Sequence, residues 1–205
     1  NFKYAVAGTR ESSGGPACNA ASLLGLWGAR CAFAGLVGRD LYGERVAREL
    51  AEAGIDVSML ELREGHATPL SFIIANRASG SRTIINRKIP GPFLRTPARE
   101  FREAWRGDPP AVLLFDGHEP EASLAAMEAF PDALTVLDAG SLREGTDILS
   151  RKVDYCIASE RFAREVSGAA PSDGPEAAKT ALTELARRGA VHAAITAGEA
   201  GCYHL

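Results

Sequence analysis

Residues 111–140, AVLLFDGHEPEASLAAMEAFPDALTVLDAG, alternate between segments of strand length and a segment of helix length. Residues 111–115 and 134–137 are apolar runs that predict buried strands, and residues 121–130 between them predict a helix. The alternation continues with a helix over 142–149 and a strand over 153–158. Repeated strand–helix units of this length are typical of a parallel sheet covered by helices.

The flanking sequence extends this alternation in both directions. Toward the C-terminus it predicts a short helix ending at Gly168, a helix over 176–188 with Asp173 and Glu176 as its capping box, a strand over 191–196 and a turn over 197–201. Toward the N-terminus it predicts strands over 2–7, 31–37 and 59–62, a helix over 16–27, and a helix from the capping residue Asp40 to Gly54. Residues 70–75 and 83–85 flank ASGS at 78–81, a pattern that predicts a β-hairpin.

These elements predict an α/β fold with a mostly parallel, doubly wound sheet, helices on both of its faces and a small β-hairpin flap. We expect residues 1–205 to form a single α/β domain. The flap would be contributed by residues 1–13 and 59–89 of that domain.

Composition excludes several classes of protein. The chain has 205 residues, of which 46% are hydrophobic and 24% charged, and its net charge of −3 argues against nucleic acid or an anionic membrane as the main partner. Its apolar runs are of strand length, too short to span a bilayer. No charged-then-apolar leader follows Asn1, so we expect no secretion signal. The four scattered cysteines predict free thiols in the cytoplasm rather than a zinc site or a disulfide framework.

Ligands of open parallel sheets bind outside the carboxyl ends of the strands, which directs attention to the residues that follow each predicted strand. After the first strand, Gly14 and Gly15 precede a helix whose free N–H groups can meet ligand oxygens, and Asn19 lies one turn further on. A tight strand–helix turn with a buried asparagine is the alternative. Neither a Walker loop nor a dinucleotide fingerprint occurs in the sequence, which disfavours a dehydrogenase.

Several segments together resemble the ribokinase-like (PfkB) carbohydrate kinases. They are GGPACNAA at 14–21, GLVGRDLYG at 35–43, LAEAGI at 50–55, SGSRT at 79–83, VLD at 136–138 and TAGEAG at 196–201. The first two match the family's G-G-x-x-x-N-x-A and G-x-x-G-x-D-x-x-G segments at the family's spacing, and the others follow in the family's order. The resemblance covers nearly the whole chain and implies a sugar site beside a nucleotide site.

The resemblance implies that five residues bind the sugar: Gly14, Gly15, Asn19, Arg82 and Asp116. Arg82 lies on the hairpin flap, and a solvated hairpin arginine is the alternative interpretation. Asp116 follows the strand at 111–115, and its carboxylate can accept two hydroxyl hydrogen bonds, which suits a polyol. A cap that precedes the next helix is the alternative role for Asp116.

For the nucleotide, the resemblance implies Ser159, Thr196, Gly198 and Gly201, together with ATP and Mg²⁺ and, as a further option, a monovalent cation. Many relatives have N-x-x-E where this chain has Ser159-Glu-Arg-Phe, so Glu160 is the candidate metal ligand. Asp138 would lie near the phosphates or would cap the next helix. The departure at 159–162 and the acidic Asp116 resemble the ketohexose end of the family, ketohexokinase and sulfofructose kinase.

The family's D-T-x-G-A-G-D loop, whose last Asp is the catalytic base, does not occur in these 205 residues. We therefore expect an incomplete domain that lacks the strand with which the family's domain begins, upstream of the predicted strand over 2–7, and this loop. Two hypotheses follow: an ATP-dependent sugar kinase that transfers the γ-phosphoryl group to a hydroxyl of a small sugar, such as a ketohexose, or a non-catalytic sugar- or nucleotide-binding module. Exposed flap strands also favour a homodimer.

Overall fold

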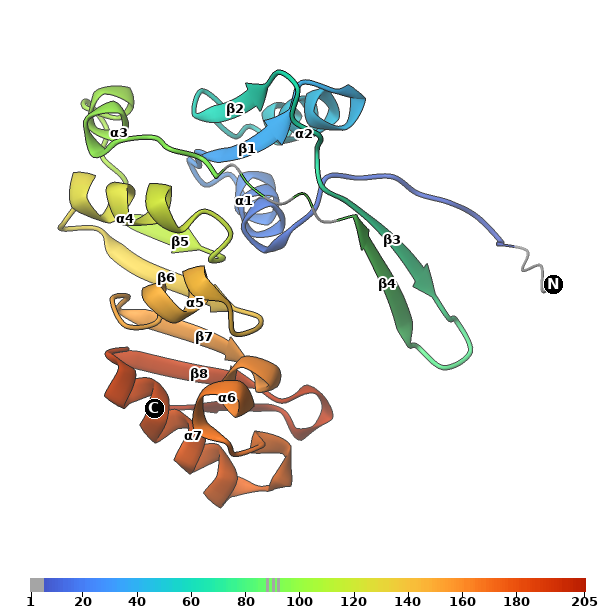
Figure 1. The fold of residues 1–205 in the computed structure, drawn as a ribbon, viewed down its shortest axis with the longest axis vertical. Coiled ribbons are helices and arrows are strands. Elements are labelled where there is room, and N and C mark those ends of the chain that lie inside the picture. The colour runs from blue at the N-terminus through green and yellow to red at the C-terminus, as the bar shows by residue number, and fades with distance from the viewer. Residues whose placement is uncertain (1–5, 88, 90, 92) are drawn as a thin grey trace. The chain divides into compact units, whose positions relative to one another are not determined.

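The computed structural model describes residues 6–87, 89, 91 and 93–205. The chain divides into two compact units, residues 1–92 and 93–205 (Figure 1), and each is described by itself. Both units combine helices with parallel strand pairs, and a separate antiparallel hairpin follows in the first. The predicted α/β class, the mostly parallel pairing and the hairpin are therefore confirmed.

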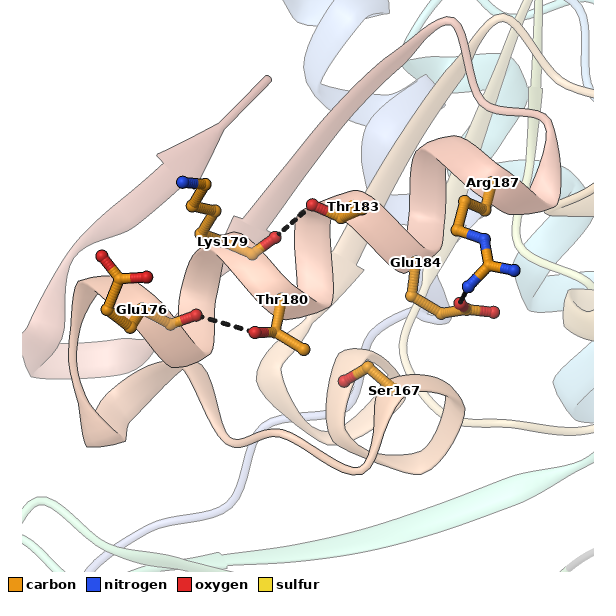
Figure 2. A pocket seen from close by; sticks show the side chains of 7 residues that line it. All are labelled: Ser167, Glu176, Lys179, Thr180, Thr183, Glu184 and Arg187. Carbon is orange, nitrogen blue, oxygen red and sulfur yellow. Dashed lines mark hydrogen bonds and ion pairs between the residues drawn. The ribbon is translucent and has the colours of Figure 1, made fainter.

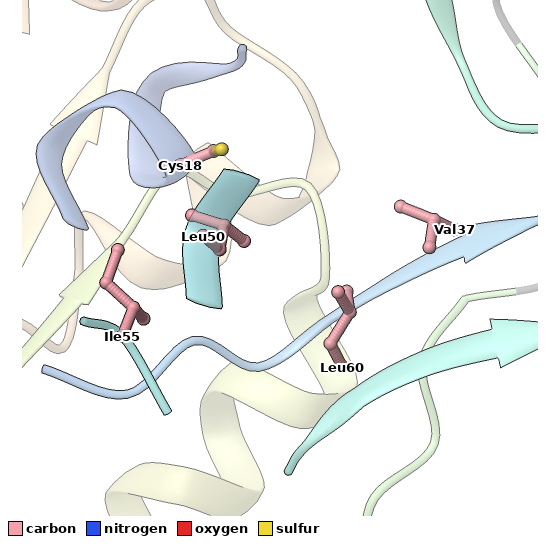
Figure 3. Close-up of a cluster of buried hydrophobic side chains, with 5 residues drawn as sticks. All are labelled: Cys18, Val37, Leu50, Ile55 and Leu60. Carbon is pink, nitrogen blue, oxygen red and sulfur yellow. The ribbon is translucent and has the colours of Figure 1, made fainter. Parts of the chain in front are cut away.

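The first unit begins with α1 (Pro16–Leu26), β1 (Gly35–Gly38), α2 (Leu41–Glu52) and β2 (Leu60–Arg63). β1 and β2 pair in parallel, with Gly35 opposite Leu60; α2 packs against both strands, and α1 packs against α2. Five buried side chains form the core of this unit (Figure 3): Cys18, Val37, Leu50, Ile55 and Leu60. The strand predicted over 2–7 lies mostly outside the described residues, and Val6 and Ala7 belong to no strand.

Two glycines of the GLVGRDLYG segment lie where no side chain fits, one between β1 and α2 and one between β1 and the segment that follows β2. A Cβ on Gly43 would lie 1.9 Å from the Gly38 carbonyl oxygen, and a Cβ on Gly38 would lie 2.1 Å from the His66 carbonyl oxygen. Asp40 is the N-cap of α2, as predicted, and accepts hydrogen bonds from the backbone N–H groups of Tyr42 and Gly43. This close approach explains the glycine spacing in structural terms.

The hairpin consists of β3 (Leu70–Ala75) and β4 (Arg82–Arg87), paired antiparallel with Phe72 opposite Ile85 and Ile73 opposite Ile84. Successive side chains of a strand point to opposite faces, so each face of the hairpin carries large apolar side chains. Phe72, Ile73 and Ile85 are between 56% and 60% exposed. A two-stranded hairpin with this much exposed apolar surface is marginal on its own.

The second unit contains α3 (Ala98–Ala104), β5 (Val112–Phe115), α4 (Pro120–Ala129), β6 (Leu134–Ala139), α5 (Glu144–Leu149), β7 (Tyr155–Ser159), α6 (Glu160–Ser167), α7 (Pro175–Arg188), β8 (His192–Thr196) and β9 (Cys202–His204). Its sheet has the order β5-β6-β7-β8-β9, with β5 to β8 parallel and β9 antiparallel. Alternate residues of β5 to β8 are buried, and α4 to α7 contact these strands (Figure 1).

Three features of the second unit differ from the sequence prediction. The short helix α3 was not predicted; it is anchored by Phe101, whose ring packs on Trp105 with centroids 5.8 Å apart. The strand β9 was not predicted either. The capping box of Asp173 and Glu176 is wrong, because the N-cap of α7 is Gly174 at φ +125° and no side chain caps the helix. In the described ranges no helix has the length and apolar character needed to cross a bilayer.

Candidate active site

Four polar residues lie at the carboxyl ends of four neighbouring parallel strands in the second unit. Asp116 follows β5, Asp138 lies near the end of β6, Ser159 ends β7 and Thr196 ends β8. The register pairs Phe115 with Leu137, which brings Asp116 level with Asp138, and it pairs Ser159 with Thr196. One edge of the sheet therefore carries two carboxylates followed by two hydroxyl groups, and we call these residues the strand-end site.

Asp116 occupies a tight turn between β5 and α4. Its Oδ1 accepts a hydrogen bond of 3.0 Å from the His118 backbone N–H, and the intervening Gly117 has φ +75°. The N-cap of α4 is Glu119, so the alternative role of Asp116 as the cap of that helix is not supported. Asp116 is half-buried and lies at the carboxyl end of β5, where it does not cap α4.

Asp138 has a raised pKa. The largest cause is partial loss of hydration, although the residue keeps an exposed face; the negative charge of Asp116 raises the pKa further, and the positive charge of Arg143 lowers it. The N-cap of α5 is Arg143, so Asp138 does not cap that helix. A carboxyl group with a raised pKa beside a second carboxylate at a sheet edge is typical of a functional site.

Ser159 links two strands at the site and begins the next helix. Its hydroxyl donates a hydrogen bond of 2.7 Å to the Gly140 carbonyl after β6 and accepts one of 3.1 Å from the Phe162 N–H as the N-cap of α6. Thr196 is exposed at the end of β8 and faces Cys202 across the β8–β9 pair. Ser159 thus caps α6 and ties the end of β7 to the loop that follows β6.

The TAGEAG segment forms the turn between β8 and β9, as predicted. Gly198 has φ +57° and Gly201 has φ +90°, in the half of conformational space that glycine occupies most readily. The Ala197 N–H donates to the Gly201 carbonyl at 2.8 Å, which closes the turn. Both predicted nucleotide-binding glycines are therefore required by the backbone path of the turn itself.

Glu160, the candidate metal ligand, is engaged elsewhere. Its carboxylate accepts hydrogen bonds from the N–H and the hydroxyl of Ser172 in the short 3-10 turn Pro171–Asp173, and these bonds lower its pKa. Over the part of the chain that the structure describes, no three His, Cys, Asp or Glu side chains gather as a metal site. The contacts of Glu160 therefore give no support to its role as a magnesium ligand, which stays a prediction.

The remaining predicted sugar-binding residues belong to the first unit. Gly15 is the N-cap of α1 at φ +104°, Gly14 precedes it, and the Asn19 N–H donates to the Gly15 carbonyl at 2.9 Å. Asn19 is exposed, so the alternative of a buried asparagine is wrong. Arg82 begins β4 next to the hairpin turn and is exposed. Binding of sugar by these residues stays a prediction.

Sequence reasoning missed Arg143. Its Nη2 donates a hydrogen bond of 2.7 Å to the backbone carbonyl of Asp116, across 27 positions of sequence. No motif in the sequence marks it: it lies between Gly140 and Gly145, where the sequence predicts only a helix over 142–149. The only available signal was its position five residues after Asp138, in the loop that follows β6.

A separate depression of about 440 Å³ lies on the outer surface of α7 (Figure 2). It is lined by Ser167 of α6 and by polar side chains of α7 between Glu176 and Arg187. The hydroxyl groups of Thr180 and Thr183 donate to carbonyls of their own helix, and Arg187 pairs with Glu184. None of the predicted site residues lines this depression, so it is not a candidate for the chemistry.

Comparison with known proteins gives a consistent result. Residues 3–205 match the family model described as pfkB family carbohydrate kinase. Ketohexokinase from Mus musculus is 38% identical over 76 residues, which cover 37% of this chain and 26% of that protein. The structure of Arabidopsis thaliana ribokinase complexed with ribose and ATP has a TM-score of 0.77 at 16% identity and covers 99% of this chain and 66% of that one. A candidate ribokinase from Agrobacterium tumefaciens has a TM-score of 0.80 at 24% identity, covering 100% of this chain and 65% of that one.

These likenesses agree on the fold. The chain shares the ribokinase-like fold of both solved structures, as the resemblance predicted. It spans 65–66% of their length and 26% of the ketohexokinase.

Proposed function

Because this chain belongs to the PfkB family of carbohydrate kinases, we propose that the protein is an ATP-dependent sugar kinase. It transfers the γ-phosphoryl group of Mg-ATP to a hydroxyl of a small sugar. The observation that carries this proposal is the strand-end site, where two carboxylates and two hydroxyl groups share the carboxyl edge of one parallel sheet. In open α/β sheets this edge is where ligands bind.

The two halves of the strand-end site have different chemistry, and we assign them to the two substrates. Asp116 can accept hydrogen bonds from two sugar hydroxyl groups, and its ionised form holds a polyol more tightly than a neutral acceptor would. Ser159 and the Thr196–Gly201 turn present hydroxyl and backbone groups that suit a nucleotide. We also assign Gly14, Gly15, Asn19 and Arg82 to the sugar, as the family resemblance implies.

In the transfer, the attacking hydroxyl oxygen of the sugar forms a bond to the γ-phosphorus while the bond to the bridging oxygen of ADP breaks. The hydroxyl proton passes to a base, and no residue among these 205 is assigned that role. The contribution of the strand-end site is to hold and orient both substrates, which is a large part of catalysis in phosphoryl transfer. Mg²⁺ when bound would neutralise charge on the phosphates, and we assign it no step because the contacts of Glu160 do not support a ligand role.

A ketohexose is the substrate that we favour. The local identity to ketohexokinase and the acidic residue at Asp116 support this choice. A pentose, as bound in the ribokinase complex, is the main competitor. The two differ in size and in hydroxyl arrangement, so a panel of sugars separates them.

We further propose that two copies associate through their β3–β4 hairpins. The apolar side chains on both faces of this hairpin are more than half exposed at Phe72, Ile73 and Ile74. Burial of such a surface against a second copy would remove it from water.

The four cysteines are all free thiols, which favours a cytoplasmic protein.

The test of the proposed activity is ADP release by the full-length protein with Mg-ATP and a panel of ketohexoses, aldohexoses, pentoses and nucleosides. We expect release above background with at least one sugar, highest for a ketohexose. Sugar or nucleotide binding without turnover would instead favour the alternative, a non-catalytic binding module. Sedimentation measured in parallel, with Ile73→Lys as the variant, tests the hairpin dimer.

A further inference from the structure

Arg143 joins the loops after β5 and β6. It is the N-cap of α5, with extended backbone, and its Nη2 donates to the Asp116 carbonyl at 2.7 Å. Its positive charge also lies close enough to Asp138 to act against the rise in the pKa of that residue. One guanidinium group therefore acts on both carboxylate-bearing strand ends.

The two loops also meet through tight backbone packing. A Cβ on Gly117 would lie 2.6 Å from Thr146 Cγ2, and a Cβ on Gly145 would lie 2.2 Å from the Gly117 carbonyl oxygen. Thr146 is fully buried, and its hydroxyl accepts from the Arg143 N–H at 3.0 Å and lies 2.8 Å from the Ser141 carbonyl oxygen, to which it can donate. The first turn of α5 therefore packs directly against the turn that contains Asp116.

One donor atom of Arg143 is left without a partner within the described part of the chain. Its Nε is buried and has no hydrogen-bond partner among the described residues. A buried donor without a partner costs free energy, which offsets part of what the Arg143 hydrogen bond to the Asp116 carbonyl contributes to stability. The hydrogen bond to Asp116 and the charge beside Asp138 both act on the strand-end site.

We propose that Arg143 is a positioning residue of the strand-end site, which holds the backbone at Asp116 and so fixes where the Asp116 carboxylate meets the sugar. This inference rests on the proposed function. Arg143 acts through Asp116 and does not itself contact the substrate. Its loss should therefore weaken sugar binding and leave ATP binding and the chemical step nearly unchanged.

The kinetic test compares three variants of the full-length protein. Arg143→Met should raise the KM for the sugar about tenfold, the factor equivalent to about 1.4 kcal/mol, while kcat and the KM for ATP change by less than about twofold. Arg143→Lys keeps one donor for the Asp116 carbonyl and should recover most of the loss. Arg151→Met, which removes an exposed arginine from the other end of the same helical segment, is the matched control and should behave as wild type. A loss in kcat or in ATP affinity equal to the loss for sugar would overturn the proposal.

A double mutant separates positioning from direct contact. On an Asp116→Asn background, adding Arg143→Met should change the sugar KM by less than about twofold, because the two residues act as one unit. A further tenfold loss would mean that Arg143 contacts the substrate itself, and the positioning role would be wrong.

Amide hydrogen exchange gives a readout that needs no substrate. The His118 N–H donates to Asp116, and its exchange should become about tenfold faster in Arg143→Met, equivalent to about 1.4 kcal/mol, but not in Arg151→Met. Unchanged exchange would contradict the positioning role even in a variant too unstable for kinetics. A wild-type protein that turns over no sugar would count against the proposed function, and the exchange result would still decide the role of Arg143.

Discussion

Asp40→Asn measures how much the hydrogen bonds of the Asp40 carboxylate contribute to the stability of the first unit. The Asp40 carboxylate accepts four hydrogen bonds: from the N–H groups of Tyr42, Gly43 and Thr68 at 3.1, 2.9 and 2.9 Å, and from the Thr68 hydroxyl at 2.7 Å. Asparagine has one acceptor oxygen, and its amide group would face a backbone N–H. The substitution therefore removes hydrogen bonds that join the start of α2 to Thr68, in the segment that follows β2.

The magnitude follows from the pKa of Asp40. Partial burial acts to raise this pKa, but the hydrogen bonds from Thr68, Gly43 and Tyr42 outweigh it and lower the pKa from 3.8 to about 2. That change corresponds to roughly 2.5 kcal/mol in favour of the ionised form. Since the carboxylate is partly solvated and screened, we expect about 1–2 kcal/mol of folding free energy.

The pH dependence has a defined sign. The pKa of Asp40 is lower in the folded chain than in the unfolded one, so its contribution is complete above about pH 4 and is lost as the pH falls toward 2. Asp40→Asn should therefore be less stable than wild type by about 1–2 kcal/mol at pH 7. The difference should shrink as the pH falls from 4 toward 2, because the wild-type carboxyl group becomes half protonated at about pH 2.

The assay is urea unfolding followed by circular dichroism between pH 2 and 7, with amide exchange at Gly43 and Thr68 to assign the effect to this unit. Glu52→Gln, which changes an exposed carboxylate on the same helix, is the control and should cost less than about 0.5 kcal/mol. The reasoning is refuted if Asp40→Asn and Glu52→Gln are equally stable at pH 7, or if the cost of Asp40→Asn does not depend on pH.

Three other substitutions test the hairpin arginine, the Asp147–Arg188 ion pair and the β8–β9 turn. Arg82→Ala should weaken sugar binding and leave ATP affinity nearly unchanged in titration calorimetry; equal losses would rule out a sugar-specific role for the hairpin arginine. Asp147→Ala removes the carboxylate that pairs with Arg188, whose side chain is only 8% exposed, and should lower the free energy of unfolding by about 2 kcal/mol in urea. A cost below about 0.5 kcal/mol would mean that water compensates this charge. Gly201→Ala forces a side chain onto a residue at φ +90° and should destabilise the β8–β9 turn by about 1–3 kcal/mol and raise the KM for ATP. An unchanged KM would remove this turn from the nucleotide site.

The sheet edge could be predicted because its signals are local. Each of the four parallel strands β5 to β8 is a short, mostly apolar run with a polar residue at or next to its carboxyl end, as at Asp116 and Asp138. The strand–helix alternation predicts that these ends share one side of the sheet. Glycines with positive φ, such as Gly201, mark the turns in the same way. Strand-end residues therefore follow from sequence patterns without knowledge of distant contacts.

The parts that sequence reasoning missed depend on tertiary contacts or on competing local signals. Arg143 matters because it reaches a carbonyl 27 positions away. The predicted capping box failed because Gly174 and Pro175 begin α7 without a side-chain cap, and Asp173 belongs to the preceding 3-10 turn. The family resemblance assigns Glu160 to a metal, and only the structure shows that its carboxylate is bonded to Ser172.

The central claim is that the carboxyl edge of β5 to β8 binds the sugar through Asp116. Its most direct test is titration calorimetry of the preferred sugar into the full-length wild type, Asp116→Asn and the control Glu128→Gln, an exposed change on α4. We expect the sugar Kd to rise ten- to a hundredfold in Asp116→Asn, as for a lost hydrogen bond to a charged group, with ATP binding unchanged. A sugar Kd in Asp116→Asn equal to that of wild type would contradict it.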